Sequence, residues 1–254
     1  MAELSRSRFL ATNALLAVAF AVLGAVGGWL WESHRTSADP AAHLANGERA
    51  AIEQVVHDYL LAHPEVLPKA MDELQRRQSA SQLAGVRDEV ERAAPGAVLG
   101  NPAGKTVLVE FTDYACTYCR KSIADVDALI AANPDLKVVV RELPILTPQS
   151  ADAAKMALAA AEQGRYAAFH KAMFEAGQVD SASILQAAKT AGLDMTRALA
   201  VVARPATEAE LVRNLDLAKA LGFTGTPSWV VGDRMLTGAV GPDELGKAIA
   251  EARS

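Results

Sequence analysis

The stretch TVLVEFTDYACTYC, residues 106–119, decides the fold and contains the only two cysteines of the chain, Cys116 and Cys119. The apolar and β-branched run at 106–111 predicts a buried strand, and a helical pattern of apolar residues starts directly after it. Since the cysteines stand at this junction, we expect Cys116 at the first turn of the helix. Free backbone N–H groups and the helix dipole stabilise a thiolate at that place, and the thiolate is the reactive form in disulfide exchange.

The segment that follows completes a unit of strand, helix and strand. Residues 116–132 predict a helix that stops at Asn133-Pro134, and residues 137–142 predict the next strand. Two strands joined by a helix at this spacing pair in parallel, with a right-handed crossover. The core of the fold is therefore predicted to be α/β.

The remaining residues add helices and a hairpin. Residues 148–203 show helical patterns only, and Thr207 and Glu210 have the spacing of a capping box that opens a further helix. Two short strands then flank Gly232-Asp233, a hairpin connection, and Pro242 starts a last helix. The order predicts a mixed sheet that is interrupted by a helical insertion at about 148–203.

The N-terminal region differs in composition from the rest. Residues 9–31 contain no charge and are long enough to span a bilayer core of about 30 Å. Arg6 and Arg8 precede this segment, so the positive-inside rule places the N-terminus in the cytoplasm and the rest of the chain outside. We expect residues 1–35 to be a cytoplasmic tip and a transmembrane anchor. A cleaved signal peptide is the alternative, and it also exports the body of the protein.

Residues 36–96 are predicted to form a helical stalk. Apolar residues within 52–60 and 66–74 fall on one stripe of each of two helices, which Pro64 separates. Neither helix carries enough large apolar residues to form a core alone. The stripes must therefore pack on the following domain, on a partner or on copies of the same chain, and self-association through the stalk is one hypothesis.

Composition argues against several classes of protein. With a net charge of −5 and no basic tract beyond Arg76-Arg77, the chain has no signature of a nucleic-acid-binding protein. Two cysteines do not make a disulfide-stapled scaffold. None of the 5 histidines stands at metal-ligand spacing near them, so we expect no zinc site and no other cofactor. His170 is expected to be a structural residue of the insertion.

Two segments carry a resemblance to a known family. VEFTDYACTYCRK, residues 109–121, resembles the active-site segment of DsbA-like proteins of the thioredoxin superfamily, and GTPSW, residues 225–229, is similar to that family's X-Pro loop. The stalk near 52–77 resembles the N-terminal region of the suppressor-of-copper-sensitivity C branch, whose members can oligomerise. The resemblance implies that residues 97–254 form a thioredoxin-like α/β domain with the helical insertion, preceded by the stalk and the transmembrane helix.

The resemblance also implies a role for individual residues. Cys116 corresponds to the exposed thiol that attacks a disulfide of a client protein, and the more buried Cys119 resolves the mixed disulfide. Glu110 matches the buried acid of the superfamily, placed to exchange a proton with Cys119 through water, and burial should raise its pKa. Thr226 and Pro227 match the cis-proline loop, whose backbone is free to pair with an extended client segment.

The dipeptide between the cysteines bears on the direction of the reaction. Thr117 and Tyr118 depart from the Pro-His dipeptide of strongly oxidising members, so one source of thiolate stabilisation is missing and we expect a milder, isomerase-like oxidant. The expected function is a membrane-tethered disulfide isomerase or exchange enzyme for exported proteins, with a membrane redox partner and its catalytic domain in the bacterial periplasm. The alternatives are a DsbA-like oxidase that a membrane partner reoxidises, and a chaperone or copper-binding module.

Overall fold

The computed structural model describes residues 46–253, which divide into two compact units between Pro68 and Lys69. The anchor predicted at residues 1–35 lies outside the described residues. Within 46–253, no helix combines the length and the apolar character that a membrane crossing requires.

The N-terminal unit consists of α2 (Asn46–Ala62) and the start of α3 (Val66–Leu83). The predicted break between the two helices at Pro64 is confirmed. Most of the predicted apolar stripe of α2 is exposed: Ile52, Val55, Val56 and Tyr59 have 48% to 67% of their surface accessible, and Leu60 is half-buried. This unit therefore buries no core of its own among the described residues.

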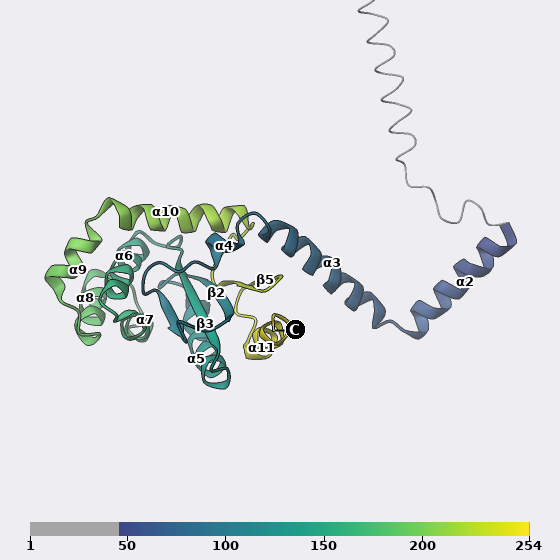
Figure 1. Cartoon of the computed structure of the whole chain (residues 1–254), viewed down its shortest axis with the longest axis horizontal. Helices are drawn as coiled ribbons and strands as arrows, with labels where there is room; N and C mark the ends of the chain where they lie inside the picture. The colour runs from purple at the N-terminus through teal and green to yellow at the C-terminus, as the bar shows by residue number, and fades with distance from the viewer. Residues whose placement is uncertain (1–45, 254) are drawn as a thin grey trace, which may run out of the picture. The chain divides into compact units, whose positions relative to one another are not determined.

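A five-stranded sheet in the order β1-β3-β2-β4-β5 organises the C-terminal unit (Figure 1). β2 and β3 are parallel, and the other neighbouring strands are antiparallel. The predicted unit of strand, helix and strand and the hairpin at Gly232-Asp233 are thereby confirmed, and the fold is mixed α/β and thioredoxin-like. The strands are β1 (Val98–Gly100), β2 (Thr106–Thr112), β3 (Leu136–Glu142), β4 (Ser228–Val231) and β5 (Arg234–Thr237).

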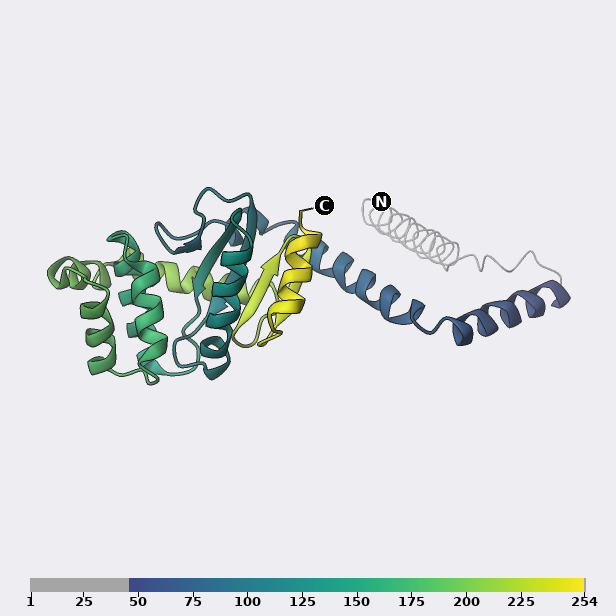
Figure 2. The same ribbon diagram turned by 90° about the horizontal axis from the view of Figure 1, so that it is seen from below.

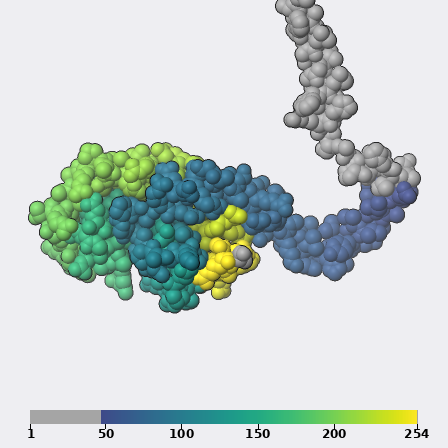
Figure 3. Space-filling view, viewed as in Figure 1, coloured from purple at the N-terminus to yellow at the C-terminus, as the bar shows by residue number. Residues whose placement is uncertain are grey.

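Helices cover both faces of this sheet. On one face, α5 (Thr117–Ala132) and α11 (Pro242–Glu251) lie side by side (Figure 2), and their apolar residues share a core with the insertion. On the other face, α4 (Arg87–Val90) and α10 (Pro205–Ala220) pack in a second core. The insertion contains α6 (Pro148–Glu162), α7 (Tyr166–Glu175), α8 (Ser181–Thr190) and α9 (Met195–Val202), and α10 continues from it as one light-green surface (Figure 3).

Two features differ from the expectations. α10 begins at Pro205, two residues before Thr207, whose hydroxyl donates to the carbonyl of Val201 and does not cap the helix. Proline suits a first helical turn because that turn needs no N–H donor at this position. The other difference is that Leu83 and Val90, which the sequence places in the stalk, are fully buried in the second core. The second half of α3 and α4 thus belong to the C-terminal unit.

Candidate active site

The two cysteines lie at the start of α5, opposite the loop before β4. Cys116 is the N-cap residue, and its Sγ accepts a hydrogen bond from the backbone N–H of Cys119 at 3.3 Å. The same thiol donates to the carbonyl oxygen of Thr226 at 3.1 Å. Both cysteines are free thiols. The structure thus brings together the dithiol and the proline loop, which stand about 110 positions apart in the sequence.

Cys116 is less exposed than the sequence led us to expect, whereas Cys119 is buried as expected. Cys116 is only 5% exposed, and Cys119 is fully buried. Cys116 is covered because its backbone N–H closes a turn onto the carbonyl of Asp113 while its sulfur contacts the proline loop. The exposed residues are those between the cysteines, Thr117 and Tyr118, and the Tyr118 side chain is 60% exposed.

Cys119 holds its proton firmly. Burial raises the pKa of its thiol far above the ordinary value, and the negative charge of Glu110 adds to the shift. A thiol in this state becomes a nucleophile only when a nearby group takes its proton.

The loop before β4 has the predicted conformation at its proline. The peptide bond between Thr226 and Pro227 is cis. The Pro227 carbonyl accepts a hydrogen bond from the N–H of Gly238 at 2.8 Å, and Ser228 Oγ donates to the carbonyl of Gly225 at 2.8 Å. The loop is therefore held by the β4–β5 hairpin at a fixed position against Cys116.

Glu110 lies in the middle of the sheet. It stands on β2 between Val140 of β3 and Trp229 of β4, and it is fully buried. Neither carboxylate oxygen has a hydrogen-bond partner among the described residues. Burial raises the pKa of this carboxyl to about 8, so the group exchanges its proton close to neutral pH.

A second buried polar cluster lies behind the catalytic turn. Glu142 Oε1 accepts hydrogen bonds from the hydroxyls of Tyr114 at 3.1 Å and Tyr166 at 2.7 Å. The Tyr114 hydroxyl also lies 3.1 Å from Nδ1 of His170. Burial raises the pKa of Glu142 to about 8 and lowers that of His170 to about 3. Sequence reasoning missed this cluster, although Tyr114 stands only two residues before Cys116.

Asp113 ties the catalytic turn to the segment before α6. Its Oδ1 accepts from the N–H of Ala115 at 2.8 Å, and its Oδ2 accepts from the N–H groups of Ile145 and Leu146 at 2.9 Å each. The side chain is buried. Since the catalytic turn and the segment that leads into α6 share these bonds, each restrains the position of the other.

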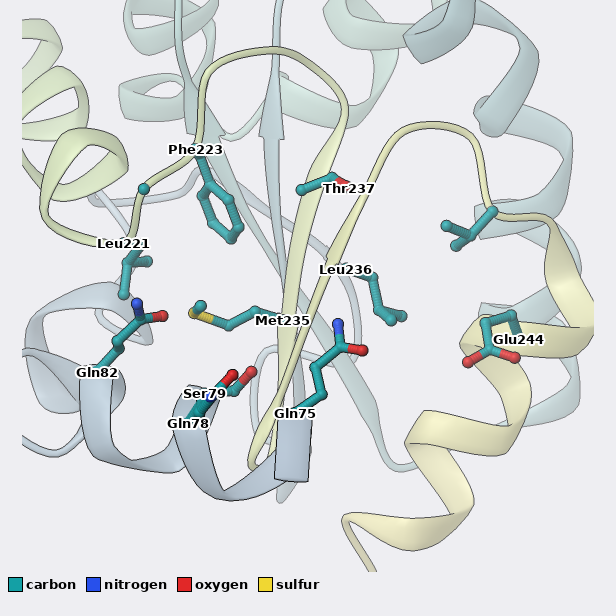
Figure 4. A pocket seen from close by; sticks show the side chains of 12 residues that line it. Gln75, Gln78, Ser79, Gln82, Leu221, Phe223, Met235, Leu236, Thr237 and Glu244 are labelled. Carbon is teal, nitrogen blue, oxygen red and sulfur yellow. The ribbon is translucent and has the colours of Figure 1, made fainter. Parts of the chain in front are cut away.

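A pocket of about 490 Å³ opens at the edge strand β5. Figure 4 shows Met235 pointing toward Phe223, and Leu236 pointing to the opposite side of the strand. Gln75, Gln78 and Gln82 of α3 form the opposite wall. Because Thr237 pairs with Ser228, one end of the pocket lies close to the cis-proline loop.

The site holds no obvious metal ligand set. Within 46–253, no group of three or more His, Cys, Asp and Glu side chains is arranged to bind a metal ion.

Comparison with known proteins identifies two matching family models. The model of the DSBA-like thioredoxin domain matches residues 107–250. The model of the copper resistance protein ScsC N-terminal domain matches residues 48–80, which cover most of α2 and most of α3. The two resemblances noted in the sequence are therefore confirmed.

Solved structures and curated relatives give the extent of the similarity. A thioredoxin-like oxidoreductase from Silicibacter pomeroyi is 40% identical, with a TM-score of 0.62 over 66% of this chain and 97% of that one. ScsC of Proteus mirabilis in a transitional conformation is 29% identical, with a TM-score of 0.60, and the alignment covers 82% of this chain and 98% of that one. The Na(+)/H(+) antiporter NhaA 3 of Salinispora tropica is 27% identical over 158 residues, 61% of this chain. The match spans about a quarter of the length of such curated relatives.

Proposed function

The chain belongs to the family of the DSBA-like thioredoxin domain, and from this membership and the site we propose that it exchanges or isomerises disulfide bonds in exported proteins. One observation carries the proposal. The Sγ of Cys116 lies between the N–H of Cys119 and the carbonyl of Thr226, so a nucleophile, its resolving partner and a client-facing loop meet at one atom.

The reaction begins at Cys116. Its thiolate attacks one sulfur of a client disulfide, forms a mixed disulfide and releases the other client sulfur as a thiolate. In isomerisation, a different client thiolate attacks the mixed disulfide, forms a new client disulfide and returns Cys116 as a thiolate. The N–H of Cys119 at 3.3 Å supports the negative charge on Cys116 at both stages.

In resolution, Cys119 acts in place of the client thiolate. Its thiol gives its proton to the carboxylate of Glu110, directly or through water. The Cys119 sulfur then bonds to Cys116, and the client leaves as a thiolate. Glu110 suits this task because it is buried, has no hydrogen-bond partner among the described residues and has a pKa of about 8.

A trapping experiment tests the proposal. Cys119→Ala removes the resolving thiol, so a mixed disulfide between Cys116 and client should accumulate and be visible on a non-reducing gel. Cys116→Ala is the matched control and should trap nothing. A Cys119→Ala protein that forms no adduct, while both variants still suppress client aggregation, would favour a chaperone module instead.

The preference for isomerisation over oxidation is supported by Thr117 and Tyr118. Both are exposed and neither is a histidine, so no imidazolium adds to thiolate stabilisation. We expect refolding of a scrambled-disulfide substrate to be faster than oxidation of a reduced one, and a mild potential in a titration against glutathione. A potential like that of strong oxidants would instead support an oxidase that a membrane partner reoxidises.

Self-association is part of the proposal for the N-terminal unit. The exposed stripe of α2 and the match of residues 48–80 to the ScsC N-terminal domain support it, because apolar side chains on a helix gain stability when a second helix covers them. Light scattering should show an oligomer for the full chain. Val55→Glu with Tyr59→Glu should yield a monomer, and an unchanged mass would contradict the proposal.

Tethering to the bacterial inner membrane with the catalytic domain in the periplasm is likewise proposed. The uncharged segment 9–31 after Arg6 and Arg8 supports it. Carbonate extraction of membranes should leave the full chain in the pellet, where a membrane thiol–disulfide partner is accessible to it. Release of a shortened chain into the soluble fraction would show cleavage.

A further inference from the structure

Glu142 shares a buried face of the sheet with Glu110. In the parallel register of β2 and β3, Glu110 stands opposite Val140 and Thr112 stands opposite Glu142. The two acids are thus two positions apart on neighbouring strands, which corresponds to about 8 Å between their Cα atoms. Both are almost completely buried, so little solvent separates their charges.

The groups around Glu142 provide hydrogen bonds but no positive charge. The turn after β2 contributes Asp113 and Tyr114, and β2 contributes Glu110. α7 contributes Tyr166, whose hydroxyl donates to Oε1 at 2.7 Å, and neutral His170. In the described part of the chain, Glu142 has no ion-pair partner, and its Oε2 has no hydrogen-bond partner.

The two carboxyls therefore interact mainly through repulsion. Burial is the largest cause that raises the pKa of Glu142 to about 8, and the charges of Asp113 and Glu110 add to it. Two buried acids of the same sign lose their protons in linked steps, because the first negative charge opposes the second.

We propose that Glu142 is a positioning residue of the exchange reaction, which holds the catalytic turn through Tyr114 and sets the proton state of Glu110 through its own charge. The proposal rests on the function proposed above. In the resolving step the proton of Cys119 moves to Glu110, the Cys119–Cys116 bond forms and the client thiolate leaves. Repulsion from an ionised Glu142 makes Glu110 keep its proton to a higher pH, so the charge of Glu142 adds to burial in setting the pH at which Glu110 becomes a base.

Glu142→Gln separates charge from position. The amide oxygen of Gln still accepts hydrogen bonds from the two tyrosine hydroxyls, but the negative charge is gone. The assay uses a mixed disulfide between Cys116 and a chromophoric aryl thiol, and it follows thiol release between pH 5 and 10. We expect the midpoint of the rate profile to move to lower pH by roughly one unit, with a maximal rate within about twofold of the wild type.

Two further variants show whether the effect passes through Glu110. In a Glu110→Gln background, the additional Glu142→Gln change should leave the pH profile as it is in Glu110→Gln alone. Glu162→Gln is the matched control, because Glu162 is an exposed acid paired with Arg204, and it should not move the midpoint.

Three outcomes would overturn the proposal: an unchanged midpoint in Glu142→Gln, a shift in the Glu110→Gln background, or an equal shift in Glu162→Gln. If Glu142→Gln does not fold, Tyr166→Phe keeps the Glu142 carboxyl but removes one of its hydrogen-bond donors. It should shift the midpoint in the same direction by a smaller amount, because Glu142 then holds its proton longer, and no shift would overturn the proposal. Trapping of a client by Cys119→Ala does not depend on Glu142. This experiment therefore tests the proposed exchange function separately from the role of Glu142.

Discussion

Arg141 and Glu142 are neighbours in the sequence, both are buried, and they point to opposite faces of the sheet. Arg141 faces α4 and α10. Its guanidinium donates to the carbonyls of Glu89 and Val90, to that of Arg92, and to the side chains of Asn214 and Glu210. On the other face, Glu110 has no partner for either oxygen within the described residues, and Glu142 has partners for only one.

The difference shows what each buried charge contributes. A guanidinium whose donors are all used joins the elements around it, and it stays ionised because its partners compensate for lost water. A buried carboxylate without partners destabilises the fold, but its proton is free to leave near neutral pH. One face of the sheet therefore holds the structure together, and the other retains groups that titrate.

The largest effect on stability should come from a change on the face of the sheet that carries Arg141. Arg141→Met keeps the bulk of the side chain but leaves three backbone carbonyls and Asn214 without their donor. We expect the free energy of unfolding to fall by about 3–5 kcal/mol, measured by urea denaturation. Arg204→Met, at an exposed ion pair with Glu162, should cost less than about 1 kcal/mol. Equal losses in the two variants would remove the distinction between the faces.

Glu110→Gln should slow the reaction without lowering the stability of the fold. With the proton acceptor gone, we expect the resolving step at pH 7 to slow by about 100-fold, which stopped-flow release of the aryl thiol measures. The free energy of unfolding should not fall, because an amide has no charge to desolvate. Alkylation of Cys116 in the Cys119→Ala background should proceed at the same rate with and without the change. A large loss of stability together with normal resolution would refute the assignment.

The pH dependence of stability gives the smallest expected effect. The folded protein keeps protons on Glu110 and Glu142 up to about pH 8, whereas the unfolded chain releases them near the ordinary value of 4.5. The stabilisation is complete below pH 4.5 and is lost as the pH rises through 8. Between pH 7.5 and 8.5, where His170 is almost entirely neutral in both states, the free energy of unfolding should fall by about 1.4 kcal/mol, roughly 0.7 kcal/mol from each carboxyl. Glu110→Gln should flatten this slope, and an unchanged slope would contradict the shifted pKa.

The sequence predicted the parts of this site that depend on local order. Cys116, Cys119 and Glu110 stand within one strand and one helical turn, so a short motif places them correctly. Arg141 and Glu142 look like charges at the exposed end of a strand, and their partners on α4, α7 and α10 are distant in sequence. Leu83 and Val90 were assigned to the stalk for the same reason, because only tertiary packing shows that they belong to the core.

The raised pKa of Cys119 also has a consequence for the reverse reaction, in which the Cys116–Cys119 disulfide is opened by a client. When a client thiolate attacks the Cys116–Cys119 disulfide at Cys116, Cys119 is the leaving group, and a thiol with a raised pKa leaves poorly unless it is protonated as it departs. In the proposed mechanism, the carboxyl that accepts this proton in one direction returns it in the other, as microscopic reversibility requires. Such a site lowers the barrier both ways, and the redox poise of the partners then decides whether bonds are made or broken.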